Sequence, residues 1–275
     1  MGMGSLVMQS IPVLYEGVNE HGLMGGQLYY REFARYAKEE EKGKDIVQPA
    51  YVVTYILTQC QNIEEVKQYF KEKMLVFNTG IFGKIPDIHW FFSDPSGASV
   101  VVEIDEHGLH LFDKNLGVLT NSPNYDWHCH HMREFAVQTP HDAMGQTLNG
   151  QPLAPCYSGT GMNGIPGDWS SPSRFVRLAL MHEYAVKGKD EKEGVTRLCR
   201  LLQNVAFSLG TIAVGDTSDL DKYDGDVSAY DYTIYTAVMC AESLSYYYND
   251  LTLHHVSMEQ FKDSDEVQII PVSFE

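Results

Sequence analysis

The sequence lacks several features that would place it outside the ordinary globular class. Its five cysteines, Cys60, Cys129, Cys156, Cys199 and Cys240, are odd in number, widely spaced and without a CxxC pair. This pattern argues against a disulfide framework and against a zinc ribbon. No apolar run approaches the roughly 18 residues of a membrane span, and the first residues lack the basic stretch and small-residue cleavage site of a signal peptide. We therefore expect a cytoplasmic protein without a membrane segment.

Basic residues are scarce. Twenty lysines and arginines stand against 37 acidic residues, so the formal net charge is −17. Such a charge argues against nucleic acid and against an anionic membrane surface as partners. Hydrophobic residues make up 44% of the 275 residues, enough to bury a substantial core. Because no repeat, low-complexity linker or domain boundary is visible, we expect a single domain over residues 1–275.

The hydrophobic pattern predicts strands at both ends of the chain. Residues 11–30 fit two strands around a turn, and residues 89–113 alternate as an antiparallel meander that GVLTNSP follows, with Asn121 at a strand end. Residues 230–272 are again rich in strand-forming side chains.

Helices are expected between these strands. An apolar helix is predicted over residues 48–60, and Asn62 with Glu65 has the spacing of a capping box. Two longer helices are predicted at roughly 172–187 and 190–208. This order favours an α+β layered fold of antiparallel sheets with helices packed outside.

The segment Asp126–His131 holds three histidines and a cysteine, which suggests a metal site. On a helix, His128 and His131 share a face, but no two histidines have the i, i+4 spacing of a helical metal site. On a strand, His128 aligns with His130 and His131 points away. Four ligands converge in neither geometry. The pattern favours a helix start with exposed polar residues, and we expect no metal.

Two polar residues leave a structural and a functional interpretation open. Arg174 lies in the first turn of a helix that Ser171 or Ser173 is predicted to cap, where the helix dipole disfavours a cation by a few tenths of a kcal/mol. A local anion or a function would explain it. Asn121 has the composition of a turn residue, yet an asparagine amide can also donate to a developing oxyanion.

The remaining candidates favour structural roles. The glycines of GTGMNGIPGD at 159–168 resemble a phosphate loop, but no Lys-Ser/Thr pair follows them. The five cysteines lack an obvious neighbouring base at a helix N-terminus, and all five are expected to act as small, buried apolar residues.

Four long stretches carry a family resemblance: EGVNEHGL at 16–23, HWFFSDPSGASVVVE at 89–103, FDKNLGVLTNSPNYDWH at 112–128 and GTGMNGIPGDWSSPSRFVRLA at 159–179. With them the chain resembles the choloylglycine hydrolase family, the conjugated bile-salt hydrolases and penicillin V acylases of the N-terminal-nucleophile superfamily. The resemblance implies an αββα four-layer sandwich of two antiparallel sheets, and cleavage of a linear amide by an N-terminal cysteine whose α-amine is the base. No cofactor is implied.

The resemblance also implies roles for individual residues. Asn121 matches the family's oxyanion asparagine, and Arg174 matches the active-site arginine of the SRF motif. Tyr29 falls at a second oxyanion position, where bile-salt hydrolases tend to carry asparagine and penicillin V acylases tyrosine.

An apolar acyl pocket is implied as well, and the residues that align with it are Ile81, Phe82 and Ile85. The substrate is thus expected to be a small-molecule amide, either a conjugated bile salt or penicillin V, with Tyr29 leaning toward penicillin V.

One departure from the family is large. The chain starts inside the family pattern, near its GMGS segment, so the nucleophile and the arginine and aspartate of the first hairpin have no counterpart. We expect an N-terminally truncated form of the fold that is inactive as it stands. A misplaced start codon, a non-catalytic remnant that binds acyl amides, and a missing part on a separate polypeptide remain alternatives. Unpaired inner strands would favour low solubility or a homo-oligomer.

Overall fold

A six-stranded antiparallel sheet is the centre of the fold. The computed structural model describes residues 1–7, 11–81, 83–213, 230–250, 253–261, 270 and 272. The sheet has the order β1-β2-β3-β6-β7-β8, and its strands are β1 (Gly2–Val7), β2 (Ile11–Val18), β3 (Met24–Tyr29), β6 (Ile88–Ser93), β7 (Ser99–Asp105) and β8 (Gly108–Phe112). The predicted hairpin at 11–30 and the predicted meander at 89–113 are both confirmed.

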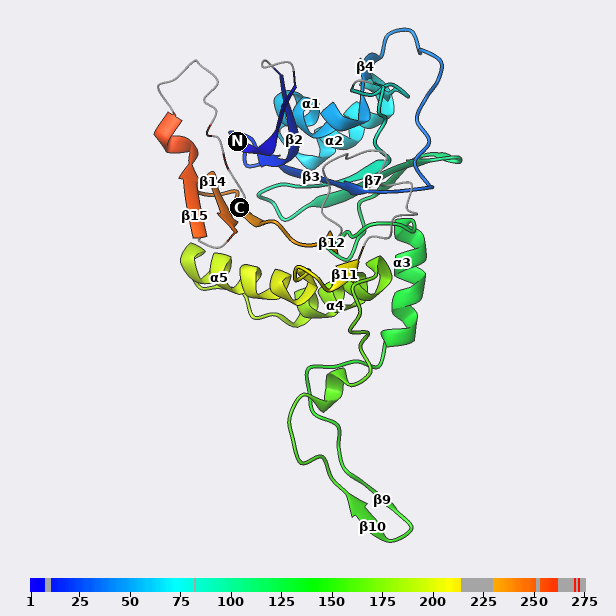
Figure 1. Cartoon of the computed structure of the whole chain (residues 1–275), viewed down its shortest axis with the longest axis vertical. Helices are drawn as coiled ribbons and strands as arrows, with labels where there is room; N and C mark the ends of the chain where they lie inside the picture. Colours follow the sequence, from blue (N-terminus) through cyan, green and yellow to red (C-terminus); the bar gives the residue numbers. More distant parts are fainter. Residues whose placement is uncertain are drawn as a thin grey trace.

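Two short helices cover one face of this sheet (Figure 1). They are α1 (Val52–Gln59), which follows the 3-10 turn η1 (Pro49–Tyr51), and α2 (Ile63–Gln68), which continues into η2 (Tyr69–Lys73). A short parallel pair, β4 (Asp45–Val47) and β5 (Met74–Val76), lies beside them. The predicted capping box is confirmed: the Asn62 side chain accepts from Glu65 N, and the Glu65 carboxylate accepts from Gln61 N.

Strand β7 shows why the sheet needs helices on both faces. Val100 and Val102 belong to the core under α1 and α2. Val101 belongs to a second core on the opposite face, under α3 (Tyr125–His131) and α4 (Ser171–Tyr184). All three side chains are fully buried. A continuous apolar run in an antiparallel strand is stable here because neither face of the strand meets water.

The other side of the sheet carries the second sheet and the longer helices (Figure 1). The helical elements are α3 (Tyr125–His131) with η3 (Met132–Phe135), α4 (Ser171–Tyr184), and α5 (Glu191–Leu202) with η5 (Gln203–Val205). The second sheet has the order β13-β14-β15 and comprises β13 (Thr236–Cys240), β14 (Ser245–Asn249) and β15 (Leu253–Ser257), followed by η7 (Met258–Phe261). A two-residue pair, β11 (Ile212–Ala213) and β12 (Tyr230–Asp231), lies near it. Helices thus enclose two antiparallel sheets, as the αββα expectation requires.

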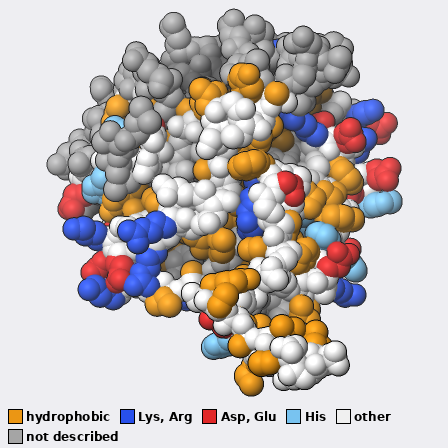
Figure 2. All heavy atoms as spheres, turned by 60° about the horizontal axis from the view of Figure 1, so that its bottom comes forward, with side chains coloured by type: hydrophobic (Ala, Val, Ile, Leu, Met, Phe, Trp, Pro, Cys, Tyr) orange, Lys and Arg blue, Asp and Glu red, His pale blue; other side chains and the backbone are white. Residues whose placement is uncertain are grey.

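A hairpin arm extends away from these layers. It contains β9 (Gln146–Leu148) and β10 (Gln151–Leu153) and, beyond them, the turn η4 (Thr160–Met162). Figure 1 places the arm at the far end of the long axis, and Figure 2 shows hydrophobic side chains on its surface.

Two local predictions are wrong. Residues 117–123, predicted to form a strand that ends at Asn121, have no regular structure. The carbonyls of Thr120 and Asn121 accept hydrogen bonds from histidine side chains rather than from a neighbouring strand. The cap of α4 is Ser170, whose hydroxyl accepts from Ser173 N, and neither Ser171 nor Ser173. Ser171 is the first helical residue and is followed by Pro172, which is well tolerated there.

Candidate active site

The candidate site is built around the irregular segment 117–124 between β8 and α3. Gly117 begins it with φ +69°, and a Cβ at this position would lie 2.7 Å from the imidazole of His182. A glycine is therefore needed for the chain to turn away from the sheet toward α4. The segment then passes over the ends of β3 and β6, which brings Asn121 beside Tyr29.

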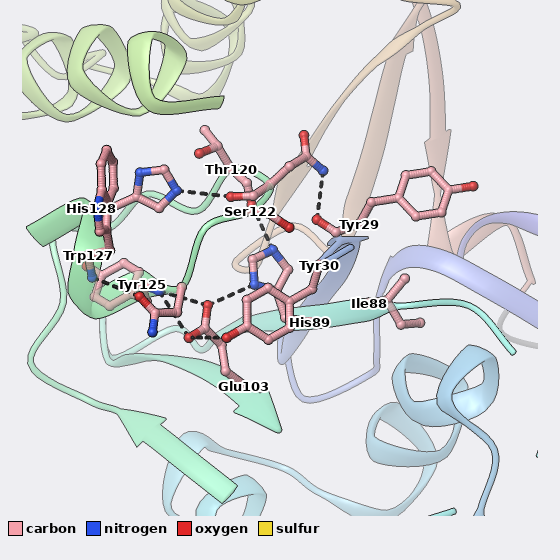
Figure 3. A network of polar contacts seen from close by, with 12 residues as sticks. Tyr29, Tyr30, Ile88, His89, Glu103, Thr120, Ser122, Tyr125, Trp127 and His128 are labelled. Atoms are coloured by element: carbon pink, nitrogen blue, oxygen red, sulfur yellow. Dashed lines mark hydrogen bonds and ion pairs between the residues drawn. The ribbon is translucent and has the colours of Figure 1, made fainter. Parts of the chain in front are cut away.

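The two ends of the Asn121 side chain have different partners. Its Nδ2 donates to the backbone oxygen of Tyr29 at 3.1 Å, and its Oδ1 accepts from the guanidinium of Arg174 at 2.8 Å. The Tyr29 contact is visible in Figure 3. Because the Tyr29 carbonyl can only accept and the Arg174 guanidinium can only donate, the two contacts fix the orientation of the Asn121 side-chain amide. One of the two Nδ2 hydrogens remains available for a third group.

Arg174 is held by neutral acceptors and an aromatic ring. Its Nε donates to Trp169 O at 2.9 Å, and its guanidinium lies 5.1 Å from the centre of the Phe207 ring. Burial lowers its pKa to about 10, with a smaller contribution from Arg177 and a partial offset from Asp231. The group is still a cation at neutral pH, so the site carries a fixed positive charge next to the Asn121 amide.

Tyr29 contacts Asn121 through its backbone, and its place at a second oxyanion position stays a prediction. Its backbone oxygen is the group that contacts Asn121, while its side chain is 49% exposed and lies under the Arg31 guanidinium, 4.5 Å from the ring centre. The backbone oxygen of Arg31 in turn accepts from Ser122 Oγ at 2.8 Å. The chain after β3 is thus fastened to the Asn121 segment at two points.

Two buried histidines hold consecutive carbonyls of this segment (Figure 3). His89 Nε2 lies 2.7 Å from Thr120 O, and His128 Nε2 lies 3.0 Å from Asn121 O. Because a carbonyl can only accept, both Nε2 atoms carry a proton. Ser171 Oγ also donates to Asn121 O at 2.7 Å. The backbone around Asn121 is therefore held by hydrogen bonds to two consecutive carbonyls, Thr120 O and Asn121 O.

His128 is thus not one of the exposed polar residues that the sequence favoured. It is fully buried and stacks on Phe175 with ring centres 4.5 Å apart. Burial lowers its pKa, so it is neutral at physiological pH. On α3, the His130 side chain is exposed, whereas the His131 side chain is 23% exposed and stacks on Trp127 with ring centres 4.9 Å apart. In the part of the chain that the structure describes, no three His, Cys, Asp or Glu side chains gather as metal ligands would.

A cleft of about 620 Å³ opens between the two sheets near this site. Its walls come from β2 and β3 on one side and from β13 and α5 on the other; they include Leu28, Leu119, Leu202 and Val238. Leu28 precedes Tyr29, and Leu119 lies two residues before Asn121. The cleft is lined largely by apolar side chains, as sites for small organic ligands usually are.

Two of the three residues predicted for an acyl pocket, Ile81 and Ile85, lie away from this cleft. Ile85 packs against the core under α1 and α2, and Ile81 forms an isolated bridge with Lys84. Neither lines the cleft of about 620 Å³, and Phe82 lies outside the described residues. Their role in acyl binding stays a prediction.

Three of the five cysteines have thiols that are poorly suited to act as a nucleophile. The expectation that all five are buried is wrong, because Cys60 is buried but Cys156 is exposed. Burial, with a smaller contribution from Glu65, raises the pKa of the Cys60 thiol to about 12. Burial also raises the pKa of Cys129 and of Cys199. A thiol with a raised pKa is protonated at neutral pH and reacts poorly.

His89 and Glu103, which support the Asn121 segment, are not among the residues predicted from the sequence. A signal was present: both are ionisable side chains inside apolar strands, in HWFF and VVVEI. In the structure His89 is 0% exposed and Glu103 is 1% exposed. A buried charge needs a partner, so two such residues in neighbouring strands could have been predicted to meet.

Comparison with known proteins gives a consistent result. The model of the family of linear amide C–N hydrolases, choloylglycine hydrolase family, matches residues 1–266. The bile salt hydrolase/transferase of Clostridium perfringens is 33% identical over 252 residues, which are 90% of this chain and 72% of that protein. The conjugated bile acid hydrolase of Lactobacillus acidophilus is 31% identical over 252 residues, 90% of this chain and 75% of that protein.

Solved structures agree. A single-residue variant of the conjugated bile acid hydrolase from C. perfringens superposes with a TM-score of 0.87 at 30% identity, covering 99% of this chain and 81% of that one. Penicillin V acylase from Agrobacterium tumefaciens gives a TM-score of 0.62 at 19% identity, covering 90% and 67%. The second likeness shows the fold alone.

Proposed function

Because the chain belongs to the choloylglycine hydrolase family of linear amide C–N hydrolases, we propose that it forms the oxyanion and substrate-binding side of an amide hydrolase site. The observation that carries the proposal is the Asn121 amide, whose orientation Arg174 and the Tyr29 carbonyl define beside an apolar cleft. The second Nδ2 hydrogen would donate to the oxygen of a tetrahedral intermediate, and the Arg174 cation would favour its negative charge.

For the substrate we propose a conjugated bile salt. Relatives that are 31–33% identical over most of their length are named for bile acid hydrolysis, and a bile salt combines a large apolar body with a small polar amide end. The apolar cleft suits the body, and Asn121 with Arg174 suits the amide. Penicillin V is the rival substrate, which the tyrosine at position 29 favours.

The nucleophile in this proposal is none of the five cysteines. The reaction needs a thiolate and a base to accept a proton, and the thiols of Cys60, Cys129 and Cys199 have raised pKa values. The family resemblance implies a cysteine whose own α-amine is the base. We therefore propose that activity requires such a residue in addition to residues 1–275.

Cytoplasmic location and homo-oligomeric assembly are also proposals. The first rests on five cysteines that form no disulfide in the structure, as expected for a reducing compartment. None of the described helices has the length and apolar character needed to cross a bilayer.

The test compares the 275-residue chain with a fusion. In the fusion, the segment that precedes the matched stretch in the C. perfringens relative is joined ahead of Met1. Both proteins are incubated with glycocholate and with penicillin V, the released amine is measured, and binding is followed by calorimetry. We expect glycocholate to bind to both and amine to be released only by the fusion.

The outcomes separate the hypotheses. Binding without release by a folded fusion would support a non-catalytic remnant that holds acyl amides. Release from penicillin V but not from glycocholate would overturn the proposed substrate while keeping the reaction. Cysteine-dependent release by the 275-residue chain alone would contradict the assignment of the nucleophile.

A further inference from the structure

A single buried carboxylate connects the elements that surround Asn121. Glu103 lies in the middle of β7 and is 1% exposed. Its oxygens are 2.9 Å from His89 Nδ1, 3.0 Å from Tyr125 N and 3.4 Å from Tyr30 Oη (Figure 3). These contacts come from β6, from the first residue of α3 and from the residue after β3. The carboxylate therefore touches three of the elements that converge on the site.

The first connection runs through His89. The imidazole has Thr120 O on one nitrogen and Glu103 Oε1 on the other. A carbonyl and a carboxylate both accept, so a proton lies on Nε2 and another lies between Nδ1 and Glu103. The pair is neutral as a unit, which is the arrangement that a buried site tolerates. Glu103 thereby holds His89 in the orientation that donates to Thr120 O.

The second connection runs through α3. Both Glu103 oxygens accept from Tyr125 N at 3.0 Å, at the N-terminus of the helix, where a negative charge is favourable. One turn later in the same helix, His128 donates to Asn121 O. The position of α3, and with it the His128 imidazole, thus depends on the same carboxylate.

We propose that Glu103 is a positioning residue for Asn121. It acts on two consecutive carbonyls, Thr120 O through His89 and Asn121 O through α3, and so sets the direction of the Asn121 side chain. Thr120 and Asn121 themselves lie in no strand or helix whose hydrogen bonds would set this direction. The proposal rests on the proposed function for the importance of Asn121, whereas the positioning itself is a property of the 275-residue chain.

The experiment observes Asn121 directly and needs no turnover. The chain is labelled with 15N-asparagine, and the side-chain NH2 signals of Asn121 are assigned by their loss in Asn121→Asp. The variants compared are Glu103→Ala, Glu103→Gln and a matched control, Asp94→Ala. Asp94 is also a buried carboxylate (8% exposed) that accepts from the first residue of a helix, Ile63 N of α2, at 2.9 Å.

In Glu103→Ala we expect the Asn121 NH2 signals to move toward free asparagine and their exchange with water to become at least about ten-fold faster. In Glu103→Gln the amide oxygen can still accept from Tyr125 N, and its NH2 can donate to His89 Nδ1, so the signals stay near those of the unmodified chain. In Asp94→Ala the melting temperature falls, but the Asn121 signals stay in place.

Unchanged Asn121 signals in a folded Glu103→Ala chain would overturn the proposal. Equal shifts in Glu103→Ala and Asp94→Ala would overturn it too, because the effect would then be general loosening. If Glu103→Ala does not fold, His89→Phe and His128→Phe replace it. Both keep ring stacks, on Tyr30 at 4.7 Å and on Phe175 at 4.5 Å, while losing the Nε2 donor. Each must then shift the Asn121 signals for the proposal to stand.

The glycocholate assay separates this proposal from the function it rests on. Shifted Asn121 signals in Glu103→Ala together with a fusion that binds but does not hydrolyse would keep the positioning role and reject the reaction. Hydrolysis by a Glu103→Ala fusion at the unmodified rate, with unmoved signals, would reject the positioning role and keep the reaction.

Discussion

Two neighbouring regions, one on each side of α3, differ in how their conformation is stabilised. The segment 117–124 has no regular secondary structure, yet the carbonyls of Thr120 and Asn121 accept hydrogen bonds from the side chains of His89, His128 and Ser171. The arm over residues 137–160 contains the paired strands β9 and β10, yet Met144 is 93% exposed and Leu148 54%. In this molecule a segment without regular secondary structure can therefore be held by buried side chains, while a paired hairpin can be largely exposed.

The two regions differ in how much a lost polar contact costs in stability. In the irregular segment the carbonyls of Thr120 and Asn121 accept from His89 and His128, which are fully buried, so the loss of either contact leaves a buried group unsatisfied. In the arm each group that loses a partner can bond to water instead. We expect substitutions near the first region to have large effects and substitutions in the second to have small ones.

The largest effect is expected from Phe175→Ala. Phe175 is fully buried against Tyr125 and His128, so truncation should lower the free energy of unfolding by about 3–5 kcal/mol. Urea denaturation followed by tryptophan fluorescence measures it. A loss under about 1 kcal/mol would mean that the core under α3 and α4 is not packed as described.

The next effect concerns catalysis in the fusion. Asn121→Ala removes the proposed oxyanion donor and should lower kcat for glycocholate about 100-fold, while KM changes little. Asn149→Gly is the control from the arm, where the asparagine has φ +46° and glycine adopts this conformation easily. Equal rates for both variants would return Asn121 to the role of a turn residue.

A smaller effect is expected from pH. Burial lowers the pKa of His128 in the folded chain, whereas in the unfolded chain it stays near 6.5. The unfolded state then binds the extra proton as pH falls below about 6.5, so the free energy of unfolding decreases there and is fully retained above it. Between pH 7.5 and 5.5, His128→Phe should lose less stability than the unmodified chain. Equal losses would contradict a neutral buried His128.

The smallest effect is expected in the arm. Leu148→Ser, on the exposed hairpin, should change the free energy of unfolding by no more than about 0.5 kcal/mol. The measurement is the same urea denaturation as for Phe175→Ala, on the same preparation. A loss above about 2 kcal/mol would show that another surface covers the arm in solution.

Much of the fold could be predicted from local patterns. The hairpin at 11–30, the meander at 89–113 and the Asn62 capping box depend on neighbouring residues, and all three are confirmed. The strand ending at Asn121 could not be rejected in this way, because its carbonyls bond to His89 and His128, which lie far along the chain or across a turn. The Ser170 cap differs by one residue from the prediction, within the usual uncertainty of a helix boundary.

The sequence by itself determined the family and the identity of Asn121, Arg174 and Tyr29 as candidates, since these lie in ordered motifs. Only the tertiary structure decided which groups these residues contact. Tyr29 contacts Asn121 through its backbone oxygen. Within Asp126–His131, the histidine that contacts the Asn121 segment is the buried His128. Glu103 supports the Asn121 segment because β6, β7 and α3 meet beneath it. Such convergence arises from packing, which no local pattern encodes.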